Sequence, residues 1–167
     1  SSKTIGYAFF DKTNEIGYIK SGVITFPKNK SAFYNIGKHN KAVDRHYLEQ
    51  IELFLWQHAD YITKVKSVVV EAPIYSKNVR SLITTGMVHG LIRSIFSKMD
   101  LEMYYIENRS WKKAFCGNGN TKKDETRVLV ESQYEITVKT DDESDAVAIG
   151  QVFYNREDEE NVRNQES

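Results

Sequence analysis

The amino-acid sequence predicts an α/β fold in which one mixed five-stranded sheet carries helices on both faces. Two observations lead to this prediction. Up to Phe26 the chain contains three short runs of β-forming residues, which is typical of an antiparallel meander. After that point, short apolar runs alternate with segments whose apolar residues recur at helical spacing, as in parallel strands connected by helices.

The predicted meander is made of short strands rich in β-branched and aromatic residues. We expect these strands over Thr4–Phe10, Glu15–Lys20 and Gly22–Phe26. Asp11–Asn14 has the composition of a turn. The segment 27–40 is largely polar and is predicted to be a loop.

Helices and strands alternate in the rest of the chain. Residues 41–63 are predicted to be helical, because four of their large apolar side chains recur at helical spacing. The apolar run Val68–Val70 predicts a strand over Ser67–Glu71 that is buried on both faces. The elements that follow are a helix, a strand and three helices, expected over Asn78–Lys98, Leu101–Ile106, Ser110–Phe115, Lys122–Gln133 and Asp142–Tyr154.

Composition and charge limit the class of protein. With 167 residues, 40% of them hydrophobic and 28% charged, the chain is expected to form one globular domain over residues 1–155. The single cysteine excludes an intramolecular disulfide framework. No apolar run is long enough for a membrane span or a signal peptide, so we expect a cytoplasmic protein. Residues 156–167 hold five acids and two bases and are predicted to be a disordered tail, which leaves a mildly basic body that permits nucleic-acid binding.

Three carboxylates are the strongest candidates for a functional site. Glu71 ends the apolar strand, at the edge where open α/β sheets bind ligands. Asp142 and Asp145 lie three residues apart at the start of the last helix, ahead of an apolar run that draws Asp145 toward the sheet. Structural alternatives remain, since acids at a helix start cap it and Glu71 can simply face water. Three converging carboxylates would require a cation such as Mg²⁺ or Mn²⁺.

The order and spacing of several motifs resemble the RuvC-type Holliday-junction resolvases of the RNase H-like superfamily. The resemblance extends from Ser1 to Tyr154 and suggests a bacteriophage version of the family. The matching segments are Ser2–Ala8, Val69–Glu71 with Lys77 and Asn78, the paired glycines of Gly86–Gly90, Lys112 and Lys123 around Gly117–Gly119, and Asp142–Ile149.

This resemblance implies a fold, an activity and a set of site residues. The fold would be RNase H-like, and the activity would be the resolution of four-way or other branched DNA by paired, symmetric nicks that leave 5′-phosphates. A homodimer would act with two Mg²⁺ per site, replaceable by Mn²⁺, and without a small-molecule cofactor, in the cytoplasm of a bacterial host. Glu71, Asp142 and Asp145 would hold the metal, and Lys112 and Lys123 would join them in catalysis.

Further residues are assigned to DNA and to the dimer by the same resemblance and by a cluster of bases. The segment Arg109–Lys123 carries five bases and suits a DNA backbone. Tyr75, with Ile74 as second choice, would wedge into the junction, although both can instead seal the helix start. Trp111 and Phe115 are expected in the core rather than stacked on bases. The DNA-binding set is Ser2, Ile74, Tyr75, Lys77, Asn78, Arg109, Lys112, Lys113, Gly117, Gly119, Lys122 and Lys123, and the dimer set is Gly86, His89 and Gly90.

One element of the family pattern is not in this sequence. The family carries a fourth acid on its first strand, which would fall two positions before Ser1. We expect either a truncated N-terminus or a loss of this acid, and weak or absent cleavage by the chain as it stands. Three alternatives follow: a junction-binding module without catalysis, an RNase H-like nuclease acting on RNA–DNA hybrids, and an actin-like kinase suggested by the loop-like Ser1–Gly6.

Overall fold

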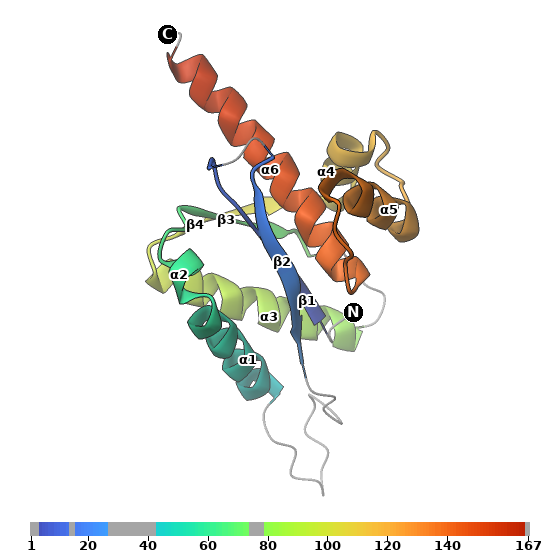
Figure 1. The fold of residues 1–167 in the computed structure, drawn as a ribbon. Coiled ribbons are helices and arrows are strands. Elements are labelled where there is room, and N and C mark those ends of the chain that lie inside the picture. The colour runs from blue at the N-terminus through green and yellow to red at the C-terminus, as the bar shows by residue number, and fades with distance from the viewer. Residues whose placement is uncertain (1–3, 14–15, 27–42, 74–78, 166–167) are drawn as a thin grey trace, which may run out of the picture. The chain divides into compact units, whose positions relative to one another are not determined.

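The computed structural model describes residues 4–13, 16–26, 43–73 and 79–165. Helices and strands alternate along these residues as the sequence predicts (Figure 1). In chain order they are β1 (Thr4–Phe10), β2 (Tyr18–Thr25), α1 (Val43–Gln57), α2 (Ala59–Ile62), β3 (Ser67–Glu71), α3 (Val79–Lys98), β4 (Glu102–Ile106), α4 (Asn108–Cys116), α5 (Lys123–Tyr134) and α6 (Asp141–Gln165).

The strands form two small sheets within the described residues, in place of the single five-stranded sheet that we expected. β1 pairs with β2, and β3 pairs with β4. The two strands predicted over Glu15–Lys20 and Gly22–Phe26 are wrong, because β2 runs through Ser21 and Gly22 without a break. Gly22 makes room for an aromatic ring instead of a turn: a Cβ there would lie 2.5 Å from the Tyr7 hydroxyl.

The helix predicted over residues 41–63 is interrupted at His58. The backbone of His58 leaves the helical region, with φ −118° and ψ 23°, and α2 begins at the next residue. Its imidazole Nδ1 lies 2.9 Å from the Phe54 carbonyl oxygen. The His58 backbone N–H still donates 3.1 Å to the same oxygen, so α1 and α2 are separated by the backbone angles of His58 and not by a lost hydrogen bond.

The last helix is longer than predicted. α6 continues to Gln165, through most of the acidic segment for which composition predicted disorder. Glu, Gln and Arg in this segment have high helix propensity, and they extend a helix that is already anchored by its apolar first half. The loop predicted over residues 27–40 lies outside the described residues.

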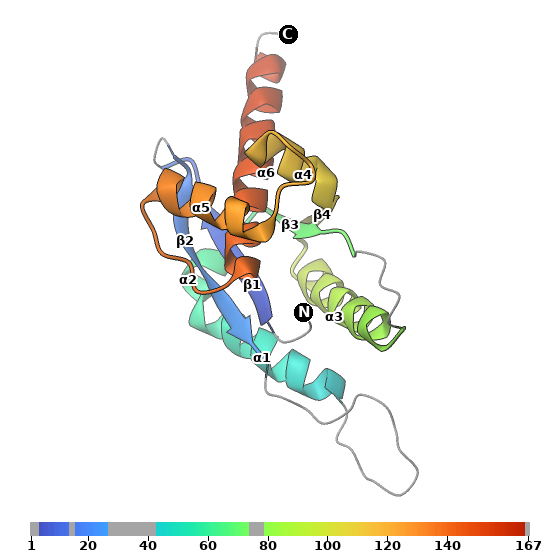
Figure 2. The same cartoon turned by 90° about the vertical axis from the view of Figure 1, so that its right-hand side faces the viewer.

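The chain divides into two compact units. The α1–α3 unit comprises residues 1–5, 24–68 and 73–103, and the α4–α6 unit comprises residues 6–23, 69–72 and 104–167. In the first unit, α1 packs on α3 (Figure 2). Its core contains buried Phe26, Tyr47 and Ile51, with the rings of Phe26 and Tyr47 4.4 Å apart.

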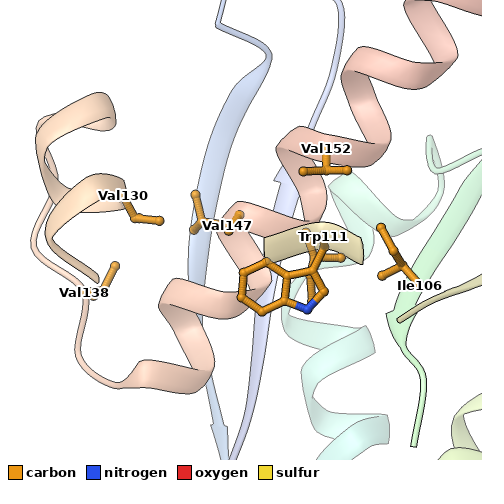
Figure 3. Close-up of a cluster of buried hydrophobic side chains, with 8 residues drawn as sticks. Ile106, Trp111, Val130, Val138, Val147 and Val152 are labelled. Atoms are coloured by element: carbon orange, nitrogen blue, oxygen red, sulfur yellow. The ribbon is translucent and has the colours of Figure 1, made fainter. Parts of the chain in front are cut away.

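Among the described residues, the α4–α6 unit has the larger core. Both α4 and α5 pack on α6, and Trp111, Val130 and Val147 have no exposed surface. Figure 3 shows Trp111 between Val147 of α6 and Ile106 at the end of β4. The apolar run that the sequence placed after Asp145 is therefore core, as predicted. Within the described residues, none of the helices combines the length and the apolar character needed to cross a bilayer.

A close backbone approach fixes the start of α6 in this unit. Gly6 of β1 lies against the backbone of Asp142, and a Cβ at Gly6 would overlap the Asp142 carbonyl. Thr140 stabilises the same helix end, because its Oγ1 accepts a hydrogen bond of 3.2 Å from the Glu143 backbone N–H. These contacts fix the position of the first turn of α6, which carries the two predicted aspartates.

Candidate active site

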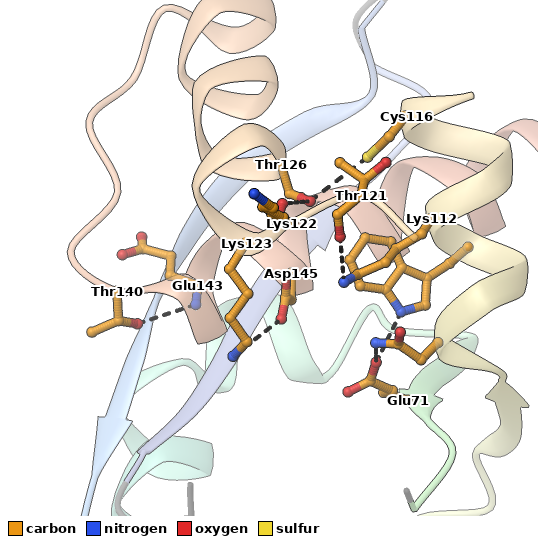
Figure 4. A network of polar contacts seen from close by, with 12 residues as sticks. Glu71, Lys112, Cys116, Thr121, Lys122, Lys123, Thr126, Thr140, Glu143 and Asp145 are labelled. Atoms are coloured by element: carbon orange, nitrogen blue, oxygen red, sulfur yellow. Dashed lines mark hydrogen bonds and ion pairs between the residues drawn. The ribbon is translucent and has the colours of Figure 1, made fainter. Parts of the chain in front are cut away.

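The carboxylate of Glu71 is held at the end of β3 by two donors from α4. Its Oε1 accepts a hydrogen bond of 2.6 Å from Asn108 Nδ2 and one of 2.9 Å from Trp111 Nε1 (Figure 4). The donors lie three residues apart, so they share one face of the helix. The strand-end acid predicted from the sequence therefore has a defined orientation.

Among the described acids of this unit, Asp145 has the pKa that departs most from its ordinary value. Its side chain is 14% exposed, and its Oδ1 is buried without a hydrogen-bond partner. Burial raises the pKa of the Asp145 carboxyl from 3.8 to about 6. The lysines Lys123 and Lys112 oppose this rise in pKa, whereas the neighbouring carboxylates Glu71 and Asp142 add to it.

Glu71 and Asp142 are thus each close enough to Asp145 to raise the pKa of its carboxyl. All three belong to the α4–α6 unit, and Asp142 and Asp145 follow each other by one turn on α6. Within the described residues, they do not gather into a group of three ligands closed around a metal position. The set nevertheless fits a hard cation, since it offers carboxylate oxygens, excess negative charge and one buried oxygen that lacks a donor.

Glu143 lies between Asp142 and Asp145 in the sequence, but its carboxylate is bonded to other parts of the protein. Its Oε1 accepts 2.7 Å from Ser21 Oγ, and its Oε2 accepts 2.8 Å from the Lys139 backbone N–H. The side chain is buried and ties α6 to β2 and to the loop before the helix. Glu143 is therefore a structural acid and separate from the candidate metal ligands.

The two predicted lysines reach this acidic region from opposite sides. Lys123 Nζ, on a side chain that is 54% exposed, lies 4.0 Å from Asp145 Oδ2. Lys112 Nζ donates 2.8 Å to the Thr121 carbonyl and lies 5.6 Å from the centre of the Trp111 ring. Figure 4 shows both lysines near Asp145. The structure therefore brings the predicted acids and the predicted lysines together.

The glycine loop between the lysines behaves as the sequence predicts. Gly117 ends α4 with a positive φ of 79°, a conformation that favours glycine. Gly119 approaches a backbone closely, because a Cβ there would lie 2.9 Å from the Arg109 carbonyl oxygen. The remaining predicted DNA contacts near this loop are solvent-exposed bases, namely Arg109, Lys113 and Lys122.

The other predicted residues lie elsewhere. Gly86, His89 and Gly90 are on α3, in the α1–α3 unit, where the two glycines are exposed and His89 is half-buried. Five predicted DNA contacts lie outside the described residues: Ser2, Ile74, Tyr75, Lys77 and Asn78.

Sequence reasoning missed the donors to Glu71. Trp111 was correctly expected in the core, but its contact with the acid was not foreseen. The available signal was the indole N–H, which needs an acceptor when the ring is buried. Asn108 gave no comparable signal, because an asparagine at a helix start is ordinarily a capping residue.

Comparisons with known proteins agree on one family. The family model described as crossover junction endodeoxyribonuclease RuvC matches residues 1–152. A crossover junction endodeoxyribonuclease RuvC of Thermosipho melanesiensis is 27% identical over 148 residues, which is 87% of this chain and 86% of that protein.

Solved structures show the same fold. The RuvC of Thermus thermophilus matches with a TM-score of 0.63 at 15% identity, covering 92% of this chain and 88% of that one. A second structure shows the same organism's RuvC in complex with a Holliday junction substrate. It matches with a TM-score of 0.63 at 14% identity, covering 92% of this chain and 95% of that one. The predicted α/β fold of the RuvC type is therefore confirmed, whereas the single five-stranded sheet is not.

Proposed function

This chain belongs to the RuvC family of crossover junction endodeoxyribonucleases, and we propose that it resolves four-way DNA junctions by metal-dependent hydrolysis with paired, symmetric nicks. The observation that carries the proposal is the Asp145 carboxyl, whose Oδ1 is buried without a donor and whose pKa is raised to about 6. A bound cation resolves both conditions, because it coordinates the oxygen and favours the ionised acid.

Each charged residue has a proposed role. Glu71, Asp142 and Asp145 would hold two Mg²⁺, with Mn²⁺ as a substitute, and bound Mg²⁺ supplies an activated water and stabilises the leaving oxygen. Lys112 and Lys123 would stabilise negative charge on the phosphate. Exposed Arg109, Lys113 and Lys122 would contact the DNA backbone. The protein would act in the cytoplasm of a bacterial cell.

A homodimer is also proposed, with α3 as its contact. Leu82, Ile83 and Met87 are large apolar side chains that α3 leaves exposed. Apart from the backbone of α3 itself, no described part of the chain lies within 4 Å of a Cβ placed on Gly86 or Gly90, which would leave room for a second helix. A two-fold dimer presents two equivalent sites, as two symmetric nicks require.

The test is a cleavage assay on labelled synthetic four-way junctions, with Mg²⁺, Mn²⁺ or EDTA and a gel shift in parallel. The 167-residue chain is compared with a version extended by a short strand that carries the expected fourth acid. Paired nicks from the extended protein in Mg²⁺ or Mn²⁺, none in EDTA, and junction binding by both would support the proposal. A shift without nicks from either would favour a non-catalytic junction-binding module.

An RNA–DNA hybrid serves as the competing substrate in the same assay. We expect the hybrid to be cut at least tenfold more slowly than the junction. Faster hydrolysis of the hybrid, with neither shift nor nicks on the junction, would replace the resolvase with a hybrid nuclease.

A further inference from the structure

We propose that Asn108 and Trp111 form a clamp that positions Glu71 for a divalent cation. The inference rests on the proposed function, because it concerns the same metal site. It assigns positioning residues to that site, and neither residue is expected to touch substrate or cation. We call this pair the Glu71 clamp.

The clamp acts on one oxygen of the carboxylate. Both donors bond to Oε1, at 2.6 Å from Asn108 and 2.9 Å from Trp111. Neither of them contacts Oε2, so the clamp leaves that oxygen for the cation. Two bonds from one helix face also fix the plane of the carboxylate, since they restrict rotation about its last bond.

Both parts of the clamp are fixed by surrounding structure. Trp111 has no exposed surface and packs in the core that contains Ile106 and Val147. The Ala72 backbone N–H donates 2.8 Å to the Ile106 carbonyl, which pins the residue after Glu71 to the end of β4. The acid and its donors are therefore held by the same core, and the carboxylate position is set before any cation binds.

The clamp differs in charge from the contact at the neighbouring acid. Asp145 has a lysine ammonium 4.0 Å from its Oδ2, whereas Glu71 has two neutral N–H donors. Neutral donors order a carboxylate without adding a positive charge that repels a metal ion. As far as the described residues go, Glu71 can therefore bind a cation without an ion pair being broken, and the lysine remains available for phosphate.

The test measures Mn²⁺ affinity without DNA, by calorimetry or by electron paramagnetic resonance of free Mn²⁺. Asn108→Leu and Trp111→Phe each remove one donor, and Trp111→Phe keeps an aromatic ring in the core. We expect each to weaken Mn²⁺ binding about tenfold, in the range found for residues that orient metal ligands. Trp56→Phe is the control, because Trp56 is 80% exposed on α1, and it should leave the affinity unchanged.

A double-mutant cycle separates positioning from general damage. In a Glu71→Ala background the clamp has no acceptor to hold, so Asn108→Leu should no longer change Mn²⁺ affinity. In the metal-free protein, the indole N–H signal of Trp111 should lose protection from hydrogen exchange when Glu71 becomes Ala.

Three results would overturn the clamp: an unchanged Mn²⁺ affinity in Asn108→Leu, an equal loss in the Glu71→Ala background, or no Mn²⁺ binding by the parent protein. The assay also separates the clamp from the proposed function. Normal Mn²⁺ binding with the expected coupling, but no cleavage of any junction, would refute the resolvase activity and leave the clamp in place.

Discussion

The two compact units of this chain differ in what their buried and exposed surfaces do. The α4–α6 unit buries Trp111, Val130 and Val147 completely and uses that core to support the acids and lysines of the candidate site. The α1–α3 unit has a smaller buried core and leaves apolar side chains of α3 in solvent, Ile83 and Met87 among them. Under the proposed function, the first unit would hold a preorganised site, and the exposed apolar side chains of α3 would meet a second copy of the chain.

Glu71 and Asp145 differ in the surroundings of their carboxylates. Glu71 is anchored at the edge of the core by neutral donors, whereas Asp145 is drawn into the core by the apolar residues that follow it on α6. Burial without a hydrogen bond at Oδ1 makes Asp145 a source of instability in the metal-free protein. The α4–α6 unit, which has the larger core among the described residues, therefore also contains the carboxylate that is least favourably placed, that of Asp145.

The largest expected effect contrasts the two tryptophans. Trp111→Ala should lower the free energy of unfolding by about 3–5 kcal/mol, since it empties a fully buried site. Trp56→Ala, in the α1–α3 unit, should change it by less than about 0.5 kcal/mol because that ring is 80% exposed. Urea unfolding in EDTA measures both, and comparable losses from the two variants would contradict the difference between the units.

The second prediction concerns Asp145→Asn, which should separate activity from stability. In the version extended by the fourth acid, cleavage should fall by more than about 100-fold because a proposed metal ligand is lost, while junction binding persists. In EDTA at pH 7.5, the variant should be more stable than the parent by up to about 3 kcal/mol, which corresponds to the rise in pKa from 3.8 to about 6. Full nuclease activity in this variant would remove Asp145 from the site.

The raised pKa of Asp145 makes the free energy of unfolding of the metal-free protein depend on pH. Between pH 4 and 6 the native Asp145 holds a proton that the unfolded chain has released, as its pKa of about 6 requires. The free energy of unfolding of the metal-free parent should therefore fall as pH rises through this window and stay lower above it. Asp145→Asn should lack this component, and identical pH profiles for the two proteins would show that burial does not perturb the acid.

Sequence reasoning was most successful where one local signal determines the structure. The apolar run after Asp145 predicted a buried helix face, and the two glycines after Cys116 predicted a positive φ and a close backbone approach. In both cases the signal lies in a short stretch of sequence, although the contacts themselves include residues farther along the chain. The RuvC motifs added the two lysines to the three acids that their positions in the sequence had already indicated, and the roles of all five stay predictions.

The failures depend on contacts between distant residues. Gly22 resembles a break, yet it continues β2 because the Tyr7 ring fills the space that a side chain would take. The donors to Glu71 are separated from it by 37 and 40 residues, so no spacing rule connects them. Long-range partners of this kind become visible only when the fold places them together.

A smaller effect is expected from two glycines that serve different purposes. Gly6→Ala should destabilise the chain by about 1–3 kcal/mol, because the new methyl meets the Asp142 backbone. Gly86→Ala adds its methyl into open space and should raise monomer stability by up to about 1 kcal/mol through helix propensity. Thermal unfolding at low protein concentration distinguishes them, and a loss of stability in both would mean that Gly86 also has an internal contact.

The smallest effect on folding is expected at Met87, where the change should appear in assembly instead. Met87 of α3 is 43% exposed, and Met99, which follows the helix, is 40% exposed and serves as the matched control. Either residue changed to Lys should alter the free energy of unfolding by less than about 0.5 kcal/mol. Only Met87→Lys should lower the mass measured by sedimentation toward that of the monomer, because a lysine buried between two copies of α3 would oppose their contact. The same variant should make single nicks in place of paired ones. If both variants sediment as the parent does, the exposed face of α3 is not where two copies meet, and the contrast between the units would rest on the core alone.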